Sequence, residues 1–228
     1  MRIGIIRTKE NNTSRGTEIA QICKIKSVPI YDIAVDKRTK KRQNSRRGKR
    51  LVKKLYENGI SVCVAERDFL WLGNWGVTVV SDSFDFFRQR AGRLALQFAE
   101  HNGIDADFLI TGGRFTEVVE AAKEILKYKR MIYVVNNAFE DIAEAVAEDT
   151  GVCISSDIPE KVTEVRMNDE ESFLRFGEKE ASVSDFSVYI SPDNSQIFPG
   201  SQEPRLVKIL EMGGFLRKNE IKVEYLQK

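Results

Sequence analysis

Short apolar runs rich in β-branched residues alternate with longer amphipathic segments over the first two thirds of the chain. This alternation is typical of βαβ units around a parallel sheet. The expected strands are residues 3–6, 28–35, 61–65, 77–80, 108–111, 131–135 and 152–155. We therefore predict an α/β fold with a Rossmann-like, doubly wound, mainly parallel sheet of about six or seven strands. Because a helix-length segment joins strands 108–111 and 131–135, they should be parallel neighbours.

Apolar residues at helical spacing predict the helices between these strands. The clear ones are residues 45–58, 84–98, 116–126 and 139–150, and a weaker one is expected over 15–23. After about residue 158 the rhythm changes to strands at 162–167, 186–190 and 221–225, a helix at 205–212 and a turn-rich connection. The sequence thus predicts a core over 1–158 and a C-terminal β extension or small subdomain over 159–228, packed on the core.

Charge is divided unevenly along the chain. The sequence has 36 basic and 34 acidic side chains, yet residues 37–54 hold eleven basic and no acidic ones. Residues 138–180 hold thirteen acidic and four basic side chains. Like charges at such density repel one another, so the basic run predicts an anionic partner.

Cysteine and histidine usage excludes several classes of site. Cys23, Cys63 and Cys153 are far apart and form no C-x-x-C pair, which argues against zinc and favours a reducing compartment. Cys63 and Cys153 lie in apolar runs and are expected to be buried. No apolar span approaches a membrane helix, so we expect a cytoplasmic protein without a membrane partner. His101 is the sole histidine, and its place at a helix end suits a structural role better than a Ser-His-Asp or Cys-His mechanism.

The best candidate for a ligand site follows the strand at 108–111. Gly112 and Gly113 would let the backbone approach a ligand, and the helix beginning near Thr116 would direct free N–H groups there. Arg114 adds a positive charge suited to phosphate or carboxylate. Neither G-x-G-x-x-G nor the P-loop pattern is present. We therefore predict that this loop binds a small anionic ligand, and a nucleotide is one candidate. The alternative is that the glycines serve only an ordinary strand-to-helix turn.

Other polar loops follow expected strands and should meet Gly112 at the same edge of the sheet. Their candidate ligand-binding residues are Ser81, Asp82, Ser83, Asn136 and Asn137. Several of these are also ordinary N-cap residues, which is the structural alternative. Asp82 could pair with Asp157 as acid and base or hold magnesium. No pattern assigns a reaction, a catalytic residue or a cofactor.

Residues 69–76 place Trp71 and Trp75 close together. Such a segment could stack on a base or cover a pocket, or it could fill a hydrophobic edge of the sheet or contact another subunit. The second interpretation is favoured.

The basic run could neutralise either of two partners. The first is nucleic acid, whose phosphates would bind candidate residues Lys40, Lys41, Arg42, Arg46, Arg47 and Arg50. Because the run lacks aromatic residues, it would contact phosphates rather than read bases. The second is the acidic segment 138–180 of the same or another subunit, which would make a homo-oligomer. Residues 37–44 are expected to form a mobile loop, with a helix beginning near Ser45.

Overall fold

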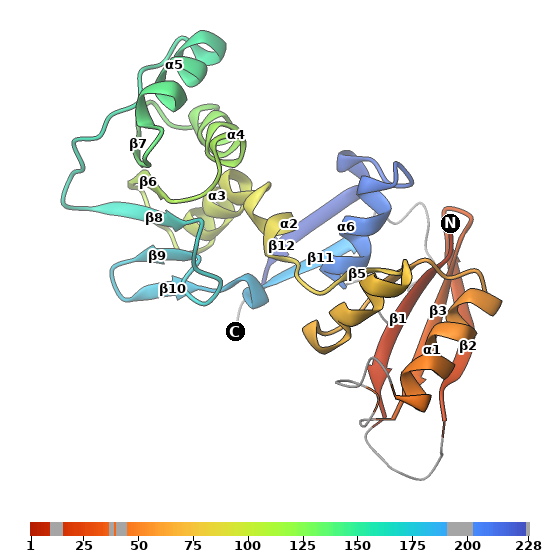
Figure 1. Ribbon diagram of the computed structural model, residues 1–228. Helices are drawn as coiled ribbons and strands as arrows, with labels where there is room; N and C mark the ends of the chain where they lie inside the picture. The colour runs from red at the N-terminus through yellow and green to blue at the C-terminus, as the bar shows by residue number, and fades with distance from the viewer. Residues whose placement is uncertain (10–15, 37–38, 40–44, 191–202, 227–228) are drawn as a thin grey trace. The chain divides into compact units, whose positions relative to one another are not determined.

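The computed structural model describes residues 1–9, 16–36, 39, 45–190 and 203–226 (Figure 1). The chain divides into two compact units. Unit 1 consists of Met1–Ser83 and Tyr189–Lys222, and unit 2 of Phe84–Val188 and Val223–Lys228. The chain therefore crosses between the units three times, and the two units are described separately below.

Unit 1 contains a five-stranded mixed sheet, sheet A, in the order β2-β3-β1-β4-β5. Strand β2 is antiparallel to β3, and all the other neighbours are parallel. The strands are β1 (Ile3–Thr8), β2 (Glu18–Ile25), β3 (Val28–Val35), β4 (Val62–Val64) and β5 (Thr78–Val80). The helices are α1 (Arg46–Glu57), the 3-10 helix η2 (Arg67–Trp75), α6 (Pro204–Met212) and the 3-10 helix η5 (Lys218–Glu220).

Strand β2 replaces the helix that we expected over residues 15–23, so that prediction was wrong. Lys26 and Ser27 form a two-residue turn in which both backbones have positive φ, 48° and 68°. This is the geometry of the tight hairpin turn that matches strand twist, and it folds β2 back onto β3. The sequence signal was hidden because lysine and serine stand where asparagine and glycine are usual.

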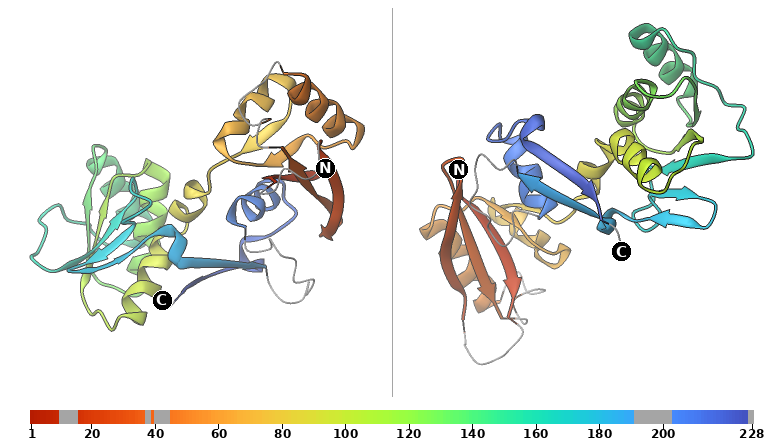
Figure 2. Two further views of the ribbon diagram at one scale, coloured as in Figure 1. Left: turned by 90° about the horizontal axis from the view of Figure 1, so that it is seen from below. Right: turned by 180° about the vertical axis from the view of Figure 1, so that it is seen from behind.

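Helix α1 forms where the sequence predicts it and lies against one face of sheet A (Figure 2). The Ser45 side chain accepts a hydrogen bond from the Gly48 N–H at 3.0 Å, which caps the first turn. Leu51, Val52 and Leu55 are buried in a core with the apolar side chains of sheet A. The helix therefore turns one apolar stripe inward and leaves its other sides to charged residues.

The tryptophan segment forms η2 and packs on the same core. Phe69 and Leu72 are fully buried, and Trp71 and Trp75 lie partly buried against them. The Tyr56 hydroxyl donates to the Trp75 carbonyl, which ties η2 to α1. This confirms the structural interpretation of the two tryptophans.

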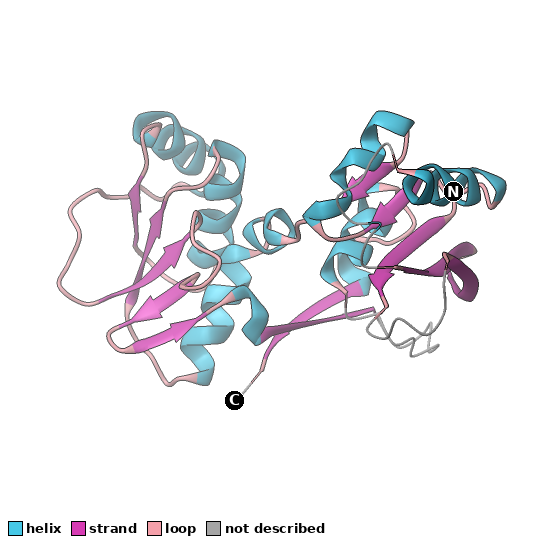
Figure 3. Ribbon diagram, turned by 60° about the horizontal axis from the view of Figure 1, so that its bottom comes forward, coloured by secondary structure: helices cyan, strands magenta, loops and turns pink. Residues whose placement is uncertain are grey.

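Unit 2 contains a second five-stranded mixed sheet, sheet B, in the order β10-β9-β8-β6-β7. The strands are β6 (Asp107–Thr111), β7 (Ile132–Val135), β8 (Val162–Arg166), β9 (Leu174–Phe176) and β10 (Lys179–Ala181). The helices are α2 (Phe84–Arg88), α3 (Ala91–His101), α4 (Phe115–Leu126), α5 (Phe139–Thr150) and the 3-10 helix η3 (Val183–Asp185). Helix α4 packs between α3 and α5 (Figure 3). Strands β11 (Phe186–Ile190) and β12 (Ile221–Tyr225) form a two-stranded sheet that runs across the unit boundaries.

The helix expected over residues 84–98 is broken into α2 and α3. At the break, the Arg90 guanidinium donates to the Phe86 carbonyl at 3.1 Å and lies over the Phe86 ring at 3.9 Å. It thus satisfies one of the carbonyls that a helix end leaves without a partner. His101 is the last residue of α3, where it packs edge-on against Tyr225 at 5.1 Å. The helix-end position predicted for it is confirmed.

The fold class is α/β, but the prediction of one sheet was wrong. Strands β6 and β7 are parallel neighbours, as predicted. Residues 152–155 contribute only one bridge, from Ser155 to Tyr133, and Cys153 is exposed rather than buried. Strand β8 pairs with β6 instead, so residue 158 lies inside unit 2. After β8, the two strands β9 and β10 complete sheet B in antiparallel pairing, whereas β11 and β12 form the separate two-stranded sheet.

No described helix is long and apolar enough to cross a membrane.

Candidate functional site

The predicted ligand residues do not lie on one sheet edge. Ser81, Asp82 and Ser83 follow β5 in unit 1, whereas Gly112 and Asn136 follow strands of unit 2. Asp82 and Asp157 likewise belong to different units. The convergence expected from a single sheet was therefore wrong, because the strands divide between sheets A and B.

Gly112 and Gly113 form a tight loop that is bonded to its own unit. Both have positive φ, 70° and 82°, which explains the choice of glycine. The Gly112 N–H donates to the Val135 carbonyl at 3.3 Å, and the Gly113 N–H donates to Oδ1 of Asn168 at 3.2 Å. A Cβ at Gly112 would lie 2.4 Å from Nδ2 of Asn168. The close approach that the glycines permit is thus occupied by Asn168, which sequence reasoning missed.

The N-terminus of α4 is occupied by a carboxylate of the protein. Oε2 of Glu117 accepts from the Arg114 N–H at 3.1 Å, and Glu117 is only 6% exposed. The same oxygen lies 3.4 Å from Nε of Arg88, which also pairs with Asp85. Arg114 and Thr116 are exposed at this end of α4. The sequence contained one sign of this capping interaction, because a glutamate stands three residues after the N-cap residue. The capping motif was not recognised because Arg114 is not a usual N-cap residue.

Asn136 closes the same loop from β7. Its Nδ2 donates to the carbonyls of Gly112 at 3.0 Å and Gly113 at 3.2 Å, and its Oδ1 accepts from the Ala138 N–H. Asn137 is exposed beside it. The N–H groups of Gly112, Gly113 and Arg114 already have partners within unit 2, and ligand binding at Gly112 and Gly113 stays a prediction.

Helix α1 presents the densest positive charge of the described residues. Its exposed cations are Arg46, Lys49, Arg50, Lys53 and Lys54. These side chains lie outside the buried stripe of Leu51, Val52 and Leu55, as predicted. Lys40, Lys41 and Arg42, the other predicted contacts, lie outside the described residues, as does most of the loop expected over 37–44.

A cavity of about 490 Å³ opens beside α1. It is bounded by α1, by residues just before β2 and by residues just after β3. The lining residues are Gly16, Thr17, Asp36, Thr39, Arg47, Arg50, Lys53, Lys54 and Glu57. Thr39 is only 2% exposed, so its side chain belongs to the wall rather than to the surface.

The charges in this wall are partly balanced. Nη1 of Arg47 lies 3.1 Å from Oδ2 of Asp36, and Nζ of Lys53 lies 3.7 Å from Oε1 of Glu57. The Lys54 ammonium donates to the Thr17 carbonyl. Arg50 makes no ion pair with any residue that the structure describes. The wall can therefore still accept negative charge.

Cysteine and metal chemistry receive no support from the described part of the chain. It contains no group of three histidine, cysteine, aspartate or glutamate side chains arranged to hold a metal ion. Cys63 is fully buried in unit 1, and burial raises the pKa of its thiol to about 12, which keeps it protonated and unreactive.

Neither the protein-family models nor the curated proteins and solved structures contain a match to this chain.

Proposed function

We propose that this protein binds nucleic acid by contacting its phosphates with the positively charged sides of α1. The observation that carries the proposal is the helix itself: an ordered element with six basic side chains, whose single acidic residue is Glu57 at its end. The buried stripe fixes the helix on sheet A, so the cations are held at constant spacing. Such an array is suited to a regular row of phosphates.

Binding of this kind would be insensitive to base sequence. Phosphate contacts set position and affinity, whereas base edges carry specificity. Tyr56, 58% exposed, is the one large aromatic side chain on the exposed part of α1. A single exposed tyrosine could stack on a base, but it offers little basis for reading a sequence.

The small-ligand site at Gly112 and Gly113 is the weaker candidate. Strand β6 is parallel to both β7 and β8 there, and a Rossmann-like unit with an anion bound at the strand ends is still part of our proposal for unit 2. It would have to displace Glu117 from the Arg114 N–H and Asn168 from the Gly113 N–H. On helix α1, Arg46, Lys49 and Arg50 make no ion pair with any described residue, so a phosphate there displaces no carboxylate from them, which favours this helix.

Self-association is the second candidate, and α5 supplies the observation that favours it. Its exposed carboxylates are Glu140, Asp141, Glu144, Glu148 and Asp149, the last of which pairs with Lys123. A second copy could bring this acidic surface to α1. The three free cysteines suit the reducing, cytoplasmic setting that we propose for either function.

The test is the salt dependence of binding to a labelled DNA duplex, measured by fluorescence anisotropy. Each phosphate neutralised contributes about 0.9 to the slope of log K against log salt. The double variant Arg46→Ala/Lys49→Ala should therefore lower the magnitude of that slope by about 1.8 if each residue contacts one phosphate.

The matched control is Lys127→Ala/Lys161→Ala, which removes two exposed positive charges from unit 2. It should leave the slope unchanged. The proposal fails if the wild type shows no salt-dependent binding, or if both double variants weaken binding equally. A change of oligomeric state in the α1 variant alone would favour self-association instead.

A further inference from the structure

Some of the cations of helix α1 line the cavity and others do not. Arg47, Arg50, Lys54 and Glu57 follow one another at spacings of three, four and three, so they share one side of the helix. All four line the cavity beside α1, as does Lys53. Arg46 and Lys49 do not line it, although both are exposed. These two residues are called the outer cations of α1 below.

The described residues of the cavity wall include more cations than carboxylates. Among them are four cations and two carboxylates, and Asp36 lies beside Arg47 and Glu57 beside Lys53. Arg50 and Lys54 then provide two positive charges that no described carboxylate neutralises. A terminal phosphate monoester carries a charge of about −1.5 to −2 near neutral pH. A phosphate within a nucleic-acid strand carries only one negative charge, so the monoester is the better match.

The size of the cavity also suits the end of a strand. Its volume of about 490 Å³ is in the range of sites for small molecules. The cavity has room for one group of nucleotide size. An internal nucleotide would have to enter it together with the nucleotides on both of its sides, whereas a terminal nucleotide would not. Guanidinium and ammonium groups bind phosphate oxygens through charge-assisted hydrogen bonds.

From this geometry we infer that the cavity beside α1 receives the terminal phosphate of a nucleic-acid strand whose other phosphates lie along the outer cations of the helix. The inference rests on the proposed function and adds a preference for phosphorylated ends. Arg50 and Lys54 contact the terminal phosphate, and Arg46 and Lys49 contact the strand.

The experiment compares two single-stranded oligonucleotides of one sequence, the first phosphorylated at both ends and the second with hydroxyl groups at both ends. The wild type should bind the phosphorylated strand about tenfold more tightly. Arg50→Gln should reduce this preference to less than about threefold. The matched variant Lys49→Gln removes an outer cation of the same helix, one that does not line the cavity, so it should weaken both strands and keep the preference.

The possible results separate the two proposals. If both strands bind the wild type equally, the terminal-phosphate site is overturned while nucleic-acid binding stands. If neither strand binds, the proposed function itself fails. A nucleoside 5′-monophosphate tests the other source of the same chemical group. If it binds as tightly as the phosphorylated strand, the cavity serves free nucleotides, and the assignment to strand ends is overturned.

Discussion

Replacing Glu117 by glutamine tests whether the N-terminus of α4 is closed by the protein's own carboxylate. Glutamine keeps the shape of the side chain and can still accept from the Arg114 N–H. It removes the negative charge that faces both this N–H and Nε of Arg88. The substitution therefore isolates the contribution of charge at a site that is only 6% exposed.

The expected cost follows from these two interactions. A hydrogen bond to a charged group contributes about 1.5–3 kcal/mol, against about 0.5–1.5 kcal/mol for a neutral pair. The difference is about 1–1.5 kcal/mol for the hydrogen bond to the Arg114 N–H. Arg88 adds an ion pair rather than a hydrogen bond, since its Nε has no hydrogen-bond partner, and Asp85 still gives this guanidinium a counter-charge. We expect Glu117→Gln to lower the free energy of unfolding by about 1–2 kcal/mol.

The assay is urea unfolding followed by circular dichroism and by tryptophan fluorescence. Both tryptophans lie in unit 1, so fluorescence reports on that unit, whereas circular dichroism reports on the helices of both. The matched control is Glu120→Gln on the exposed side of α4, where the loss should stay below about 0.5 kcal/mol. If Glu117→Gln costs no more than this control, the carboxylate does not stabilise α4 and the reasoning is refuted.

Three further predictions concern single residues. Burial raises the pKa of the Cys63 thiol to about 12, so the folded protein keeps this proton above pH 9.0 while the unfolded protein loses it. The free energy of unfolding should therefore fall by about 1.4 kcal/mol for each pH unit above 9.0. Comparison with Cys63→Ala at each pH isolates this contribution, and identical slopes would contradict it. A thiol reagent should modify exposed Cys153 in the native protein but reach Cys63 only on unfolding, as peptide mass spectrometry would show. Gly92→Ala should lower the free energy of unfolding of unit 2, measured by urea unfolding, by about 1–2 kcal/mol despite the high helix propensity of alanine. The reason is that the new Cβ would lie 2.5 Å from the Ala121 carbonyl oxygen. An unchanged free energy of unfolding would mean that α3 and α4 move apart at little cost.

Elements with strong local patterns were predictable. The apolar stripe of helix α1 indicates a helix, the capping Ser45 indicates where it begins, and Asn58-Gly59 indicates where it ends. The parallel pairing of β6 and β7 followed from the length of the segment between them. In such cases the local sequence carries most of the information that the fold uses.

What failed depended on contacts between distant segments. Strand β2 became a strand because an unusual Lys26-Ser27 turn placed it beside β3, not because of its own pattern. The division into two sheets arose because β8 pairs with β6 across more than fifty residues. The loop at Gly112 looked open in sequence, but Asn168 lies far along the chain and occupies it in the fold.

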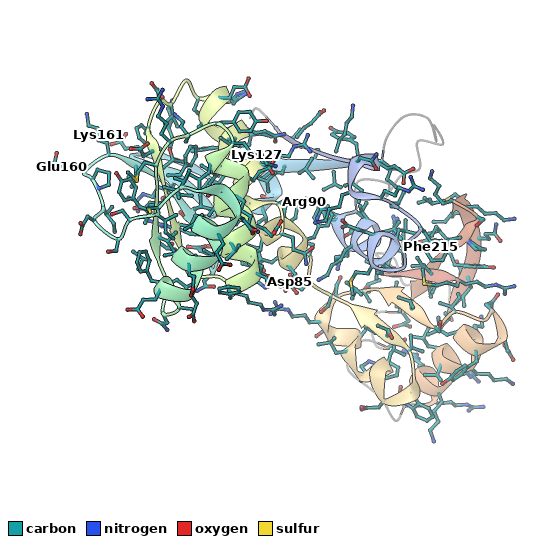
Figure 4. The ribbon with its side chains drawn as sticks, turned by 90° about the horizontal axis from the view of Figure 1, so that it is seen from above. Asp85, Arg90, Lys127, Glu160, Lys161 and Phe215 are labelled. Atoms are coloured by element: carbon teal, nitrogen blue, oxygen red, sulfur yellow. The ribbon has the colours of Figure 1, made fainter. Side chains whose placement is uncertain are left out.

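Lysine acetylation in the presence of nucleic acid tests the role of α1 most directly. The protein would be acetylated with and without a saturating DNA duplex at low salt, and each lysine quantified by mass spectrometry. Lys49 and Lys53 on α1 should be protected, whereas the exposed Lys127 and Lys161 of unit 2 should react equally in both samples (Figure 4). Unchanged acetylation of Lys49 and Lys53 by saturating DNA would contradict the assignment of nucleic-acid binding to this helix.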